Sequence, residues 1–503
     1  MSGTTSRSRW IATFVVFAAA LAFHASYAFH GIALFDEGLL ADGAWRVRDG
    51  ARLGRDAFVP YGPASYWILG PCFVCFGQSL VTLRVVAIVV QALADAAVFG
   101  IVSARSTRGG ALLAAALLAI AHGSLHKSFL LLAAVLALLA AQALARRPAP
   151  GGAFAAGALA GVAFLFRHDA GAFTGAALVA GALIDSSPGR SPVLARVAAL
   201  AGGFATVVGP AFLALLAAGL DVRAWWDHEW QRIAVQERSD VDFAGPLVDG
   251  ELRWGRVALS VGLVGAPLVH AIWGGAALLR RWRGRPLEGD SARVASALFG
   301  LLLLNQARLI PSPNHLFQAF APVAVALGDL LARRGRGLVP HLLLAAIVGG
   351  VATWAALGRS GPYSGTFRQR IAGAVELELP AGGVRLEPQT AQRLRAVVAA
   401  IQERVPEGGT IFTSPGCPLL GFLSDRRLAL PYAEPSYYYF EPRFQQEAID
   451  ALERLRPRVF VSDGSRPANY RFEDAAPLVA QYVVEHSRPV ETIGPFVVAE
   501  RVR

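Results

Sequence analysis

The chain has 503 residues, of which 54% are hydrophobic and only 17% are charged, and its mean hydropathy is +0.45. This apolar content exceeds what one soluble core needs and predicts a polytopic membrane protein. The formal net charge of +11 does not indicate a nucleic-acid partner. The arginines gather in short segments between apolar runs, which is the pattern that sets topology in a membrane.

Apolar runs predict about eleven transmembrane helices. The first, Trp10–Ala28, lacks a small-residue cleavage site and is long enough to span, so we interpret it as a retained helix and not as a signal peptide. Arg7 and Arg9, which precede the first run, place the N-terminus in the cytoplasm, and the arginine-rich segments between later runs fall on the same side. The remaining spans are expected at residues 80–103, 110–123, 127–145, 151–167, 170–185, 196–220, 257–280, 294–309, 315–332 and 338–358.

The segment between the first two spans, residues 30–79, is expected to be the first outward loop. It opens with two adjacent carboxylates, Asp36 and Glu37, which either mark the water interface or belong to a polar site. Residues 38–48 have the amphipathic pattern of a helix that lies along the interface. Residues 63–76 are apolar but short for a crossing, which predicts a second interfacial or re-entrant helix.

The composition changes near residue 359, where charge density becomes ordinary and the apolar runs become shorter. Apolar residues at helical spacing predict a helix over 394–405, and short apolar runs predict strands at 410–413, 458–461 and 496–499. We therefore expect a transmembrane domain over residues 1–358 and a small α/β extracytoplasmic domain over residues 359–503.

Several ionisable residues are expected on the same outward side as Asp36. Basic residues in short outward turns oppose the topological bias, so a shared polar site is the simplest explanation for them. Lys127 is the sole lysine among 47 basic residues. The residues in these turns are Lys127 with His126, then Arg167 with His168 and Asp169, and then Arg308 with His315.

Each of these residues also has an ordinary structural explanation. Lys127 and Arg308 would extend toward the interface from the end of a span. The histidines would be hydrogen-bonded structural residues. Asp169 would neutralise Arg167 in an interfacial ion pair. Asp95, which lies within the second span, would pair with Arg84 or face a neighbouring helix.

A carboxylate near cations and aromatic side chains is what glycosyl transfer from a lipid-linked phosphate requires. The carboxylate takes the proton of an acceptor hydroxyl as that oxygen attacks the anomeric carbon, and cations hold the phosphate that leaves. Asp36 is the candidate base, and Glu37 is its neighbour, a metal ligand or an orienting group. No cofactor is indicated, although an Asp-Glu pair can hold a divalent cation.

The first part of the chain resembles the membrane-embedded GT-C superfamily of glycosyltransferases. The resemblance rests on Asp36-Glu37-Gly38, on Y-G-P-x-x-Y-W-I-L from Tyr61, on the F-G-x-S that follows, on Arg84, and on L-F-R-H-D-A-G-A-F at 165–173. It covers roughly residues 10–185 by motif and the rest by architecture. Within the superfamily, the chain is most similar to the family 39-like group, which includes protein O-mannosyltransferases and the lipid A aminoarabinose transferase.

The resemblance implies an inverting glycosyltransferase with Asp36 as the loop carboxylate that acts as base. It also implies that Tyr61 lies near the lipid phosphate. The family often has Lys-Pro-Pro after this tyrosine, whereas this chain has Gly62-Pro63-Ala64. Lys127 or Arg167 would then have to supply the missing phosphate-binding cation.

These observations together predict a multi-pass glycosyltransferase of the cytoplasmic membrane. It would move a sugar from a polyprenyl-phosphate donor to a glycan, lipid or protein acceptor on the outer face. Two alternatives remain open: a transporter or flippase for a lipid-linked sugar, and a non-catalytic membrane assembly protein. The donor phosphate would be held by Lys127, Arg167, Arg308, Tyr61 and His126, and His168, Asp169 and His315 would complete the pocket.

Overall fold

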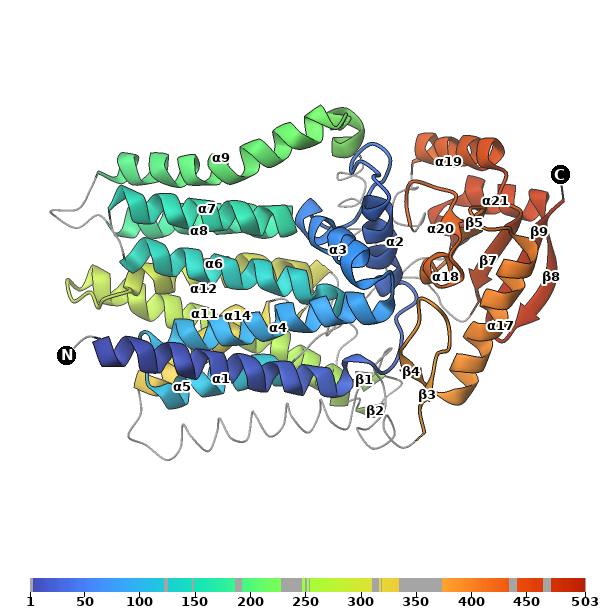
Figure 1. Ribbon diagram of the computed structural model, residues 1–503. Coiled ribbons are helices and arrows are strands. Elements are labelled where there is room, and N and C mark those ends of the chain that lie inside the picture. Colours follow the sequence, from blue (N-terminus) through green and yellow to red (C-terminus); the bar gives the residue numbers. More distant parts are fainter. Residues whose placement is uncertain are drawn as a thin grey trace. The chain divides into compact units, whose positions relative to one another are not determined.

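The computed structural model describes residues 3–121, 125–146, 149–185, 192–227, 247–248, 251–252, 254–309, 316–317, 319–333, 373–433, 441–464 and 472–502. The chain forms two compact units (Figure 1). The first unit contains Met1–Ser26, Ala87–Leu213 and Asp242–Gly358, and the second contains Tyr27–Val86, Ala214–Val241 and Arg359–Arg503. The first loop therefore belongs to the same unit as the C-terminal residues, whereas the sequence-based division had grouped it with the transmembrane part.

The first unit consists mainly of helices. They are α1 (Gly3–Ala28), α4 (Leu80–Ser103), α5 (Arg108–Ile120), α6 (Ser128–Arg146), α7 (Pro150–Phe166), α8 (His168–Ile184), α9 (Val193–Ala217), α11 (Trp254–Trp282), α12 (Asp290–Leu309) and α14 (Phe320–Arg333). The ends of α1, α4 and α9 extend into the second unit. A short 3₁₀ turn, η1 (Leu125–Lys127), precedes α6, and the two-residue strands β1 (Leu247–Val248) and β2 (Glu251–Leu252) pair with each other.

Five of these helical segments are long and apolar enough to cross a membrane. They are Arg7–Ala28, Leu80–Ser103, Leu125–Arg146, Val193–Ala217 and Gly262–Trp282. Each predicted span that lies in the described part of the chain corresponds to one of the helices above. The expected span at 338–358 lies outside the described residues. The architecture is that of a helical multi-pass membrane protein, as the apolar runs predicted.

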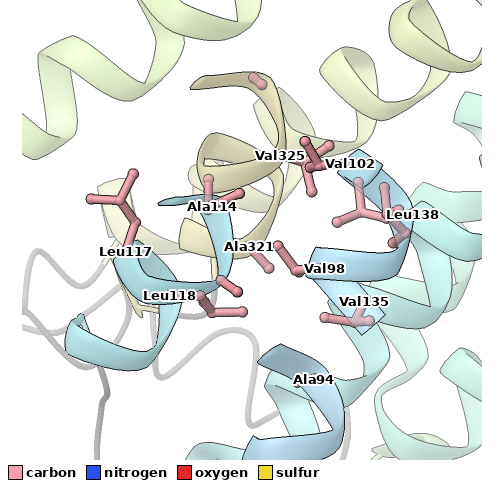
Figure 2. Close-up of a cluster of buried hydrophobic side chains, with 14 of the residues drawn as sticks. Ala94, Val98, Val102, Ala114, Leu117, Leu118, Val135, Leu138, Ala321 and Val325 are labelled. Atoms are coloured by element: carbon pink, nitrogen blue, oxygen red, sulfur yellow. The ribbon is translucent and has the colours of Figure 1, made fainter. Parts of the chain in front are cut away.

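The interior of the first unit is packed with small and branched apolar side chains. Figure 2 shows one cluster, to which α4 contributes Ala94, Val98 and Val102, and α5, α6 and α14 add further residues. These include Ala114, Leu117, Leu118, Val135, Leu138, Ala321 and Val325. Lipid tails are as apolar as these side chains, so close van der Waals packing, rather than exclusion of water, holds such helices together.

Two glycines let α7 and α9 approach closely. A Cβ atom added at Gly157 would lie 2.0 Å from the carbonyl oxygen of Leu200, and one added at Gly203 would lie 2.0 Å from that of Phe154. The two contacts are reciprocal, because each helix places a glycine against the backbone of the other. This is the small-residue packing that membrane helices use in place of large interlocking side chains.

A buried polar pair joins α1 to α4. Nε2 of His24 lies 2.7 Å from Oδ2 of Asp95, and both side chains are buried. Asp95 therefore faces a neighbouring helix and does not pair with Arg84, which the sequence had left as the alternative. A carboxylate inside a membrane helix needs such a partner because hydrocarbon cannot solvate it.

The second unit combines the first loop with a mixed sheet. The loop supplies α2 (Asp36–Arg48) and α3 (Pro63–Phe76). The C-terminal residues supply β3 (Val375–Glu376), β4 (Arg385–Leu386), α17 (Pro388–Arg404), β5 (Thr410–Thr413), α18 (Leu419–Ser424), β6 (Arg427–Leu428), α19 (Pro442–Leu455), β7 (Val459–Asp463), α20 (Phe472–Ala475), α21 (Pro477–His486), β8 (Ser487–Ile493) and β9 (Phe496–Arg501).

The main sheet has the strand order β6-β5-β7-β9-β8. Strand β5 pairs in parallel with β6 and β7, whereas β9 pairs antiparallel with β7 and β8. The three predicted strands correspond to β5, β7 and β9, and the predicted helix lies within and just beyond α17. The sequence analysis missed β8, whose residues are mostly exposed and carry no apolar run.

We expect a side chain at Gly157 to destabilise the helical unit. Gly157→Ala would press a methyl group into the backbone of α9, and such overpacking costs about 1–3 kcal/mol. Gly209→Ala in α9 is the matched control, because a Cβ atom there meets nothing within 4 Å. The midpoint of thermal unfolding in detergent should fall for the first variant only. Equal midpoints in the two variants would contradict the close packing of α7 and α9.

Candidate active site

Asp36 is the first residue of α2, and Glu37 follows it in the same turn. Asp36 is half-buried, whereas Glu37 is fully buried. The preceding residue, Phe35, provides no side-chain cap for the helix. Carboxylates in a first turn are stabilised by the positive end of the helix dipole. The two neighbouring acids are therefore in different environments although they are adjacent in sequence.

Glu37 is held by Arg84 of α4 in a two-pronged ion pair. Nε of Arg84 donates to Oε1 over 2.7 Å, and Nη2 donates to Oε2 over 2.8 Å. The backbone N–H of Ala33 also donates to Oε2, over 2.9 Å. The guanidinium further donates to the carbonyl oxygens of Ala28 and Gly31, each over 2.8 Å. Such a fork-to-fork pair fixes orientation as well as charge.

This coordination gives Glu37 a structural role. Both of its oxygens are occupied by donors, so it is poorly placed to serve as a base or as a metal ligand beside Asp36. The part of the chain that the structure describes also contains no group of three or more His, Cys, Asp or Glu residues that could hold a metal ion. Of the two adjacent acids, Asp36 is the one that is only half-buried.

The C-terminal residues hold the start of α2 from another direction. The backbone N–H of Leu419 in α18 donates to the carbonyl oxygen of Leu34 over 3.1 Å. A Cβ atom added at Gly38 would lie 2.4 Å from the same backbone nitrogen. Close to the end of α1, Arg385 of β4 exchanges backbone hydrogen bonds with Phe29 and Gly31, over 2.7 and 2.9 Å. The segment that leads into Asp36 is thus bound on several sides within the second unit.

The other end of α2 is fixed to the sheet by arginines. Nε of Arg46 donates to Asp42 over 2.7 Å, and its Nη2 donates to the carbonyl oxygen of Leu430 over 2.8 Å. The guanidinium of Arg427, in β6, lies 3.7 Å from the ring centroid of Trp45, which is a cation–π contact. Burial lowers the pKa of Arg427 to about 10, and the positive charge of Arg46 adds to this effect.

The remaining predicted residues fall into separate groups. Tyr61 is half-buried in the loop before α3, in the second unit. The first unit contains His126 and Lys127, both buried in η1, and Arg167, which lies between α7 and α8. Arg308 lies in α12, but its side chain is outside the described residues, as is all of His315. The convergence of the cationic turns with Asp36 stays a prediction.

Within the first unit, the two cationic turns are neighbours. The rings of Phe129 and Phe166 stack with their centroids 5.9 Å apart. Phe129 lies two residues after Lys127, and Phe166 immediately precedes Arg167. The structure therefore brings these two turns to the same end of the bundle, which the sequence had inferred only by counting spans.

Arg167 already has a counter-ion. Its Nε donates to Oδ1 of Asp169 over 2.6 Å, and its Nη2 donates to Oδ2 over 3.0 Å. The alternative that Asp169 neutralises Arg167 is confirmed. His168, the first residue of α8, packs against the ring of Phe164 with a centroid distance of 4.9 Å. These contacts reduce the charge that Arg167 can offer to a phosphate.

Sequence analysis did not predict the contacts of two arginines near the site, which are Arg84 with Glu37 and Arg46 with Leu430. Arg84 was noted as part of a motif and as one of two partners considered for Asp95, and its pairing with Glu37 was not expected. The available signal was its position in a mainly apolar helix, because a charge there needs a partner. Arg46 gave no such signal, since it lies in an ordinary amphipathic segment.

Comparisons with known proteins agree with this architecture. Residues 60–214 match the family model described as dolichyl-phosphate-mannose-protein mannosyltransferase. A crystal structure of ArnT from Cupriavidus metallidurans bound to undecaprenyl phosphate superimposes with a TM-score of 0.55 at 14% sequence identity, covering 99% of this chain and 98% of that one. The structure of the same protein in the apo state gives 0.53 at 14% identity, with 98% of each chain covered. A search of curated proteins finds no match.

The chain is thus a multi-pass membrane protein with the fold of ArnT. The family match over residues 60–214 and the fold agree with the resemblance to the GT-C superfamily.

We expect the Glu37–Arg84 pair to be essential for the stability of the second unit. Glu37→Gln would leave a fully buried guanidinium without its counter-charge, which costs about 3–5 kcal/mol. Asp56→Asn is the control, because Asp56 pairs with Arg52 at an exposed position of the same loop, where such pairs contribute about 0–1 kcal/mol. Thermal unfolding and limited proteolysis of the loop would measure both effects. A Glu37→Gln protein that is as stable as the Asp56→Asn protein would show that the pair does not anchor the loop.

Proposed function

We propose that this protein transfers a sugar from a polyprenyl-phosphate donor to an acceptor on the outer face of the cytoplasmic membrane, with Asp36 as the general base. The family match and the ArnT fold support the glycosyltransferase class. The ArnT structure was obtained with undecaprenyl phosphate bound, which supports a lipid-linked donor. In this proposal the N-terminus is cytoplasmic, and the C-terminal sheet and the first loop are outside.

The observation that carries the assignment of Asp36 is the contrast between the two adjacent acids. The family match begins at residue 60 and does not include the acidic pair, so the support for Asp36 comes from its surroundings. Glu37 is enclosed by Arg84 and Ala33, whereas Asp36 is half-buried at the start of a helix that is bound at both ends. A general base needs this combination of fixed position and partial exposure.

The proposed reaction is a direct displacement. The acceptor oxygen forms a bond with the anomeric carbon while the bond from that carbon to the phosphate oxygen breaks. The bonding electrons leave with the polyprenyl phosphate, and the proton of the acceptor hydroxyl goes to the carboxylate of Asp36. Attack from the side opposite the phosphate inverts the anomeric configuration. The negative charge that develops on the leaving phosphate requires fixed cations or hydrogen-bond donors.

Lys127 is the proposed main cation for that phosphate, with Tyr61 and His126 as further contacts. Arg167 lies in the neighbouring turn but shares its charge with Asp169, so its contribution would be smaller. Arg308, His168, Asp169 and His315 complete the proposed pocket. The proposed acceptor is a glycan, a lipid or a protein.

Two functions other than catalysis are alternatives to this proposal. They are transport of a lipid-linked sugar and a non-catalytic role in membrane assembly.

Asp36→Asn should abolish transfer and leave the protein folded. Loss of a general base typically lowers the rate about 10²- to 10⁴-fold. Asp56→Asn, in the same loop, should retain activity because its carboxylate is exposed and pairs with Arg52. The measurement is release of polyprenyl phosphate when purified protein is incubated with polyprenyl-phosphate sugars and membrane acceptors. Normal release by the Asp36→Asn variant would exclude Asp36 as base, and absence of release by the wild-type protein with every donor would favour the transporter or the assembly protein.

Lys127→Gln should weaken use of the donor, whereas Lys127→Arg should retain part of it. A hydrogen bond to a charged group contributes about 1.5–3 kcal/mol, so we expect kcat/KM for the donor to fall about 10- to 100-fold. Arg223→Gln, at an exposed position, is the control for removal of one positive charge. Unchanged donor kinetics in Lys127→Gln, with normal thermal stability, would remove Lys127 from the phosphate site.

A further inference from the structure

A second cationic position lies far from the acidic loop in sequence, between α4 and α5. Arg105 and Ser106 are partly buried there. Nη2 of Arg105 and Oγ of Ser106 are enclosed by protein and have no hydrogen-bond partner among the residues that the structure describes. A buried donor without a partner destabilises the folded protein, and a charged donor does so more strongly. Two such donors on adjacent residues therefore need an explanation.

Two of the nearby carboxylates, Asp290 and Asp329, already accept hydrogen bonds from other donors. Asp290 accepts hydrogen bonds from Arg280 and Arg293, over 2.6 and 2.7 Å. Asp329 accepts from Nε of Arg293 over 2.8 Å and from the indole N–H of Trp273 over 2.9 Å. This network joins α11, α12 and α14. It satisfies Arg293 but provides no hydrogen bond to Nη2 of Arg105.

Burial and charges of both signs act on Arg105. Burial lowers the pKa of Arg105 to about 10, and the positive charges of Arg293 and Arg146 act in the same direction. Asp329 and Glu288 oppose this effect only in part. The guanidinium also lies against Gly289, where an added Cβ atom would be 3.3 Å from Nε and Cζ. Gly289 therefore packs closely against the guanidinium, and a side chain at that position would crowd it.

We propose that Arg105 and Ser106 bind a phosphate group, either from the head group of an anionic phospholipid or as free phosphate. A tetrahedral oxyanion accepts hydrogen bonds from a guanidinium and from a hydroxyl at once, which would satisfy both buried donors. The site lies where α4 ends, before α5 begins. Phospholipid phosphates concentrate at the ends of membrane helices, so a lipid head group is the favoured source.

The experiment uses the full-length protein, purified and stripped of lipid in detergent. Native mass spectrometry measures binding of phosphatidylglycerol and, as a lipid without phosphate, of diacylglycerol with the same acyl chains. Thermal shift measures binding of inorganic phosphate. The variants are Arg105→Gln and Ser106→Ala, and Arg285→Gln is the control because Arg285 is exposed in the α11–α12 connection.

Phosphatidylglycerol should bind the wild-type protein and Arg285→Gln equally, and diacylglycerol should bind neither specifically. Arg105→Gln should weaken phosphatidylglycerol at least about 10-fold, because it removes a charge-assisted hydrogen bond. Ser106→Ala should weaken it less. Loss of inorganic phosphate binding alone in Arg105→Gln would identify free phosphate as the ligand. Should Arg105→Gln fail to fold, phosphatidylglycerol binding by Ser106→Ala still tests the site. Equal binding of both phosphate probes by the wild type and the variants would overturn the proposal.

Discussion

The ion pair between Glu37 and Arg84 is the interaction on which the arrangement of the first loop depends. A guanidinium in an apolar helix must be neutralised and must use its donors, since nothing in its surroundings solvates it. Arg84 does so by binding Glu37 and two carbonyl oxygens at the end of α1 and just beyond it. The end of α1, the start of α2 and the start of α4 are thereby joined at one point, and Asp36 is the residue next to that point.

The C-terminal residues complete this arrangement. Hydrogen bonds from Leu419 to Leu34 and from Arg46 to Leu430 bind both ends of α2 to elements more than 380 residues further along the chain. Gly38 allows this, because a side chain there would collide with the backbone of α18. The C-terminal sheet is therefore part of the support for Asp36. In physical terms, a base on a loop acquires a fixed position only when a second set of contacts removes the freedom of the loop.

Sequence reasoning predicted the helices and strands more readily than the side-chain pairs that join them. Apolar runs predicted the helices, because a membrane helix needs a continuous apolar stretch, and strands such as Thr410–Thr413 were visible as short apolar runs. It also singled out Asp36 and Glu37 together. It proposed Asp36 as the base but left three roles open for Glu37, since the choice depends on Arg84, 47 residues away from Glu37. The pairing of His24 with Asp95 was hidden for the same reason.

The carboxylates of the first unit form ion pairs with several of its arginines. In the first unit, four of them share three aspartates: Arg196, Arg280, Arg281 and Arg293 pair with Asp185, Asp290 and Asp329. Topology requires an excess of positive charge on one side of the bundle, whether or not acids are present to match it. Arginines beyond the available carboxylates must therefore reach water or bind anions from outside the chain. Nη2 of Arg105 is enclosed by protein, and phosphate is the anion that a membrane surface supplies in quantity.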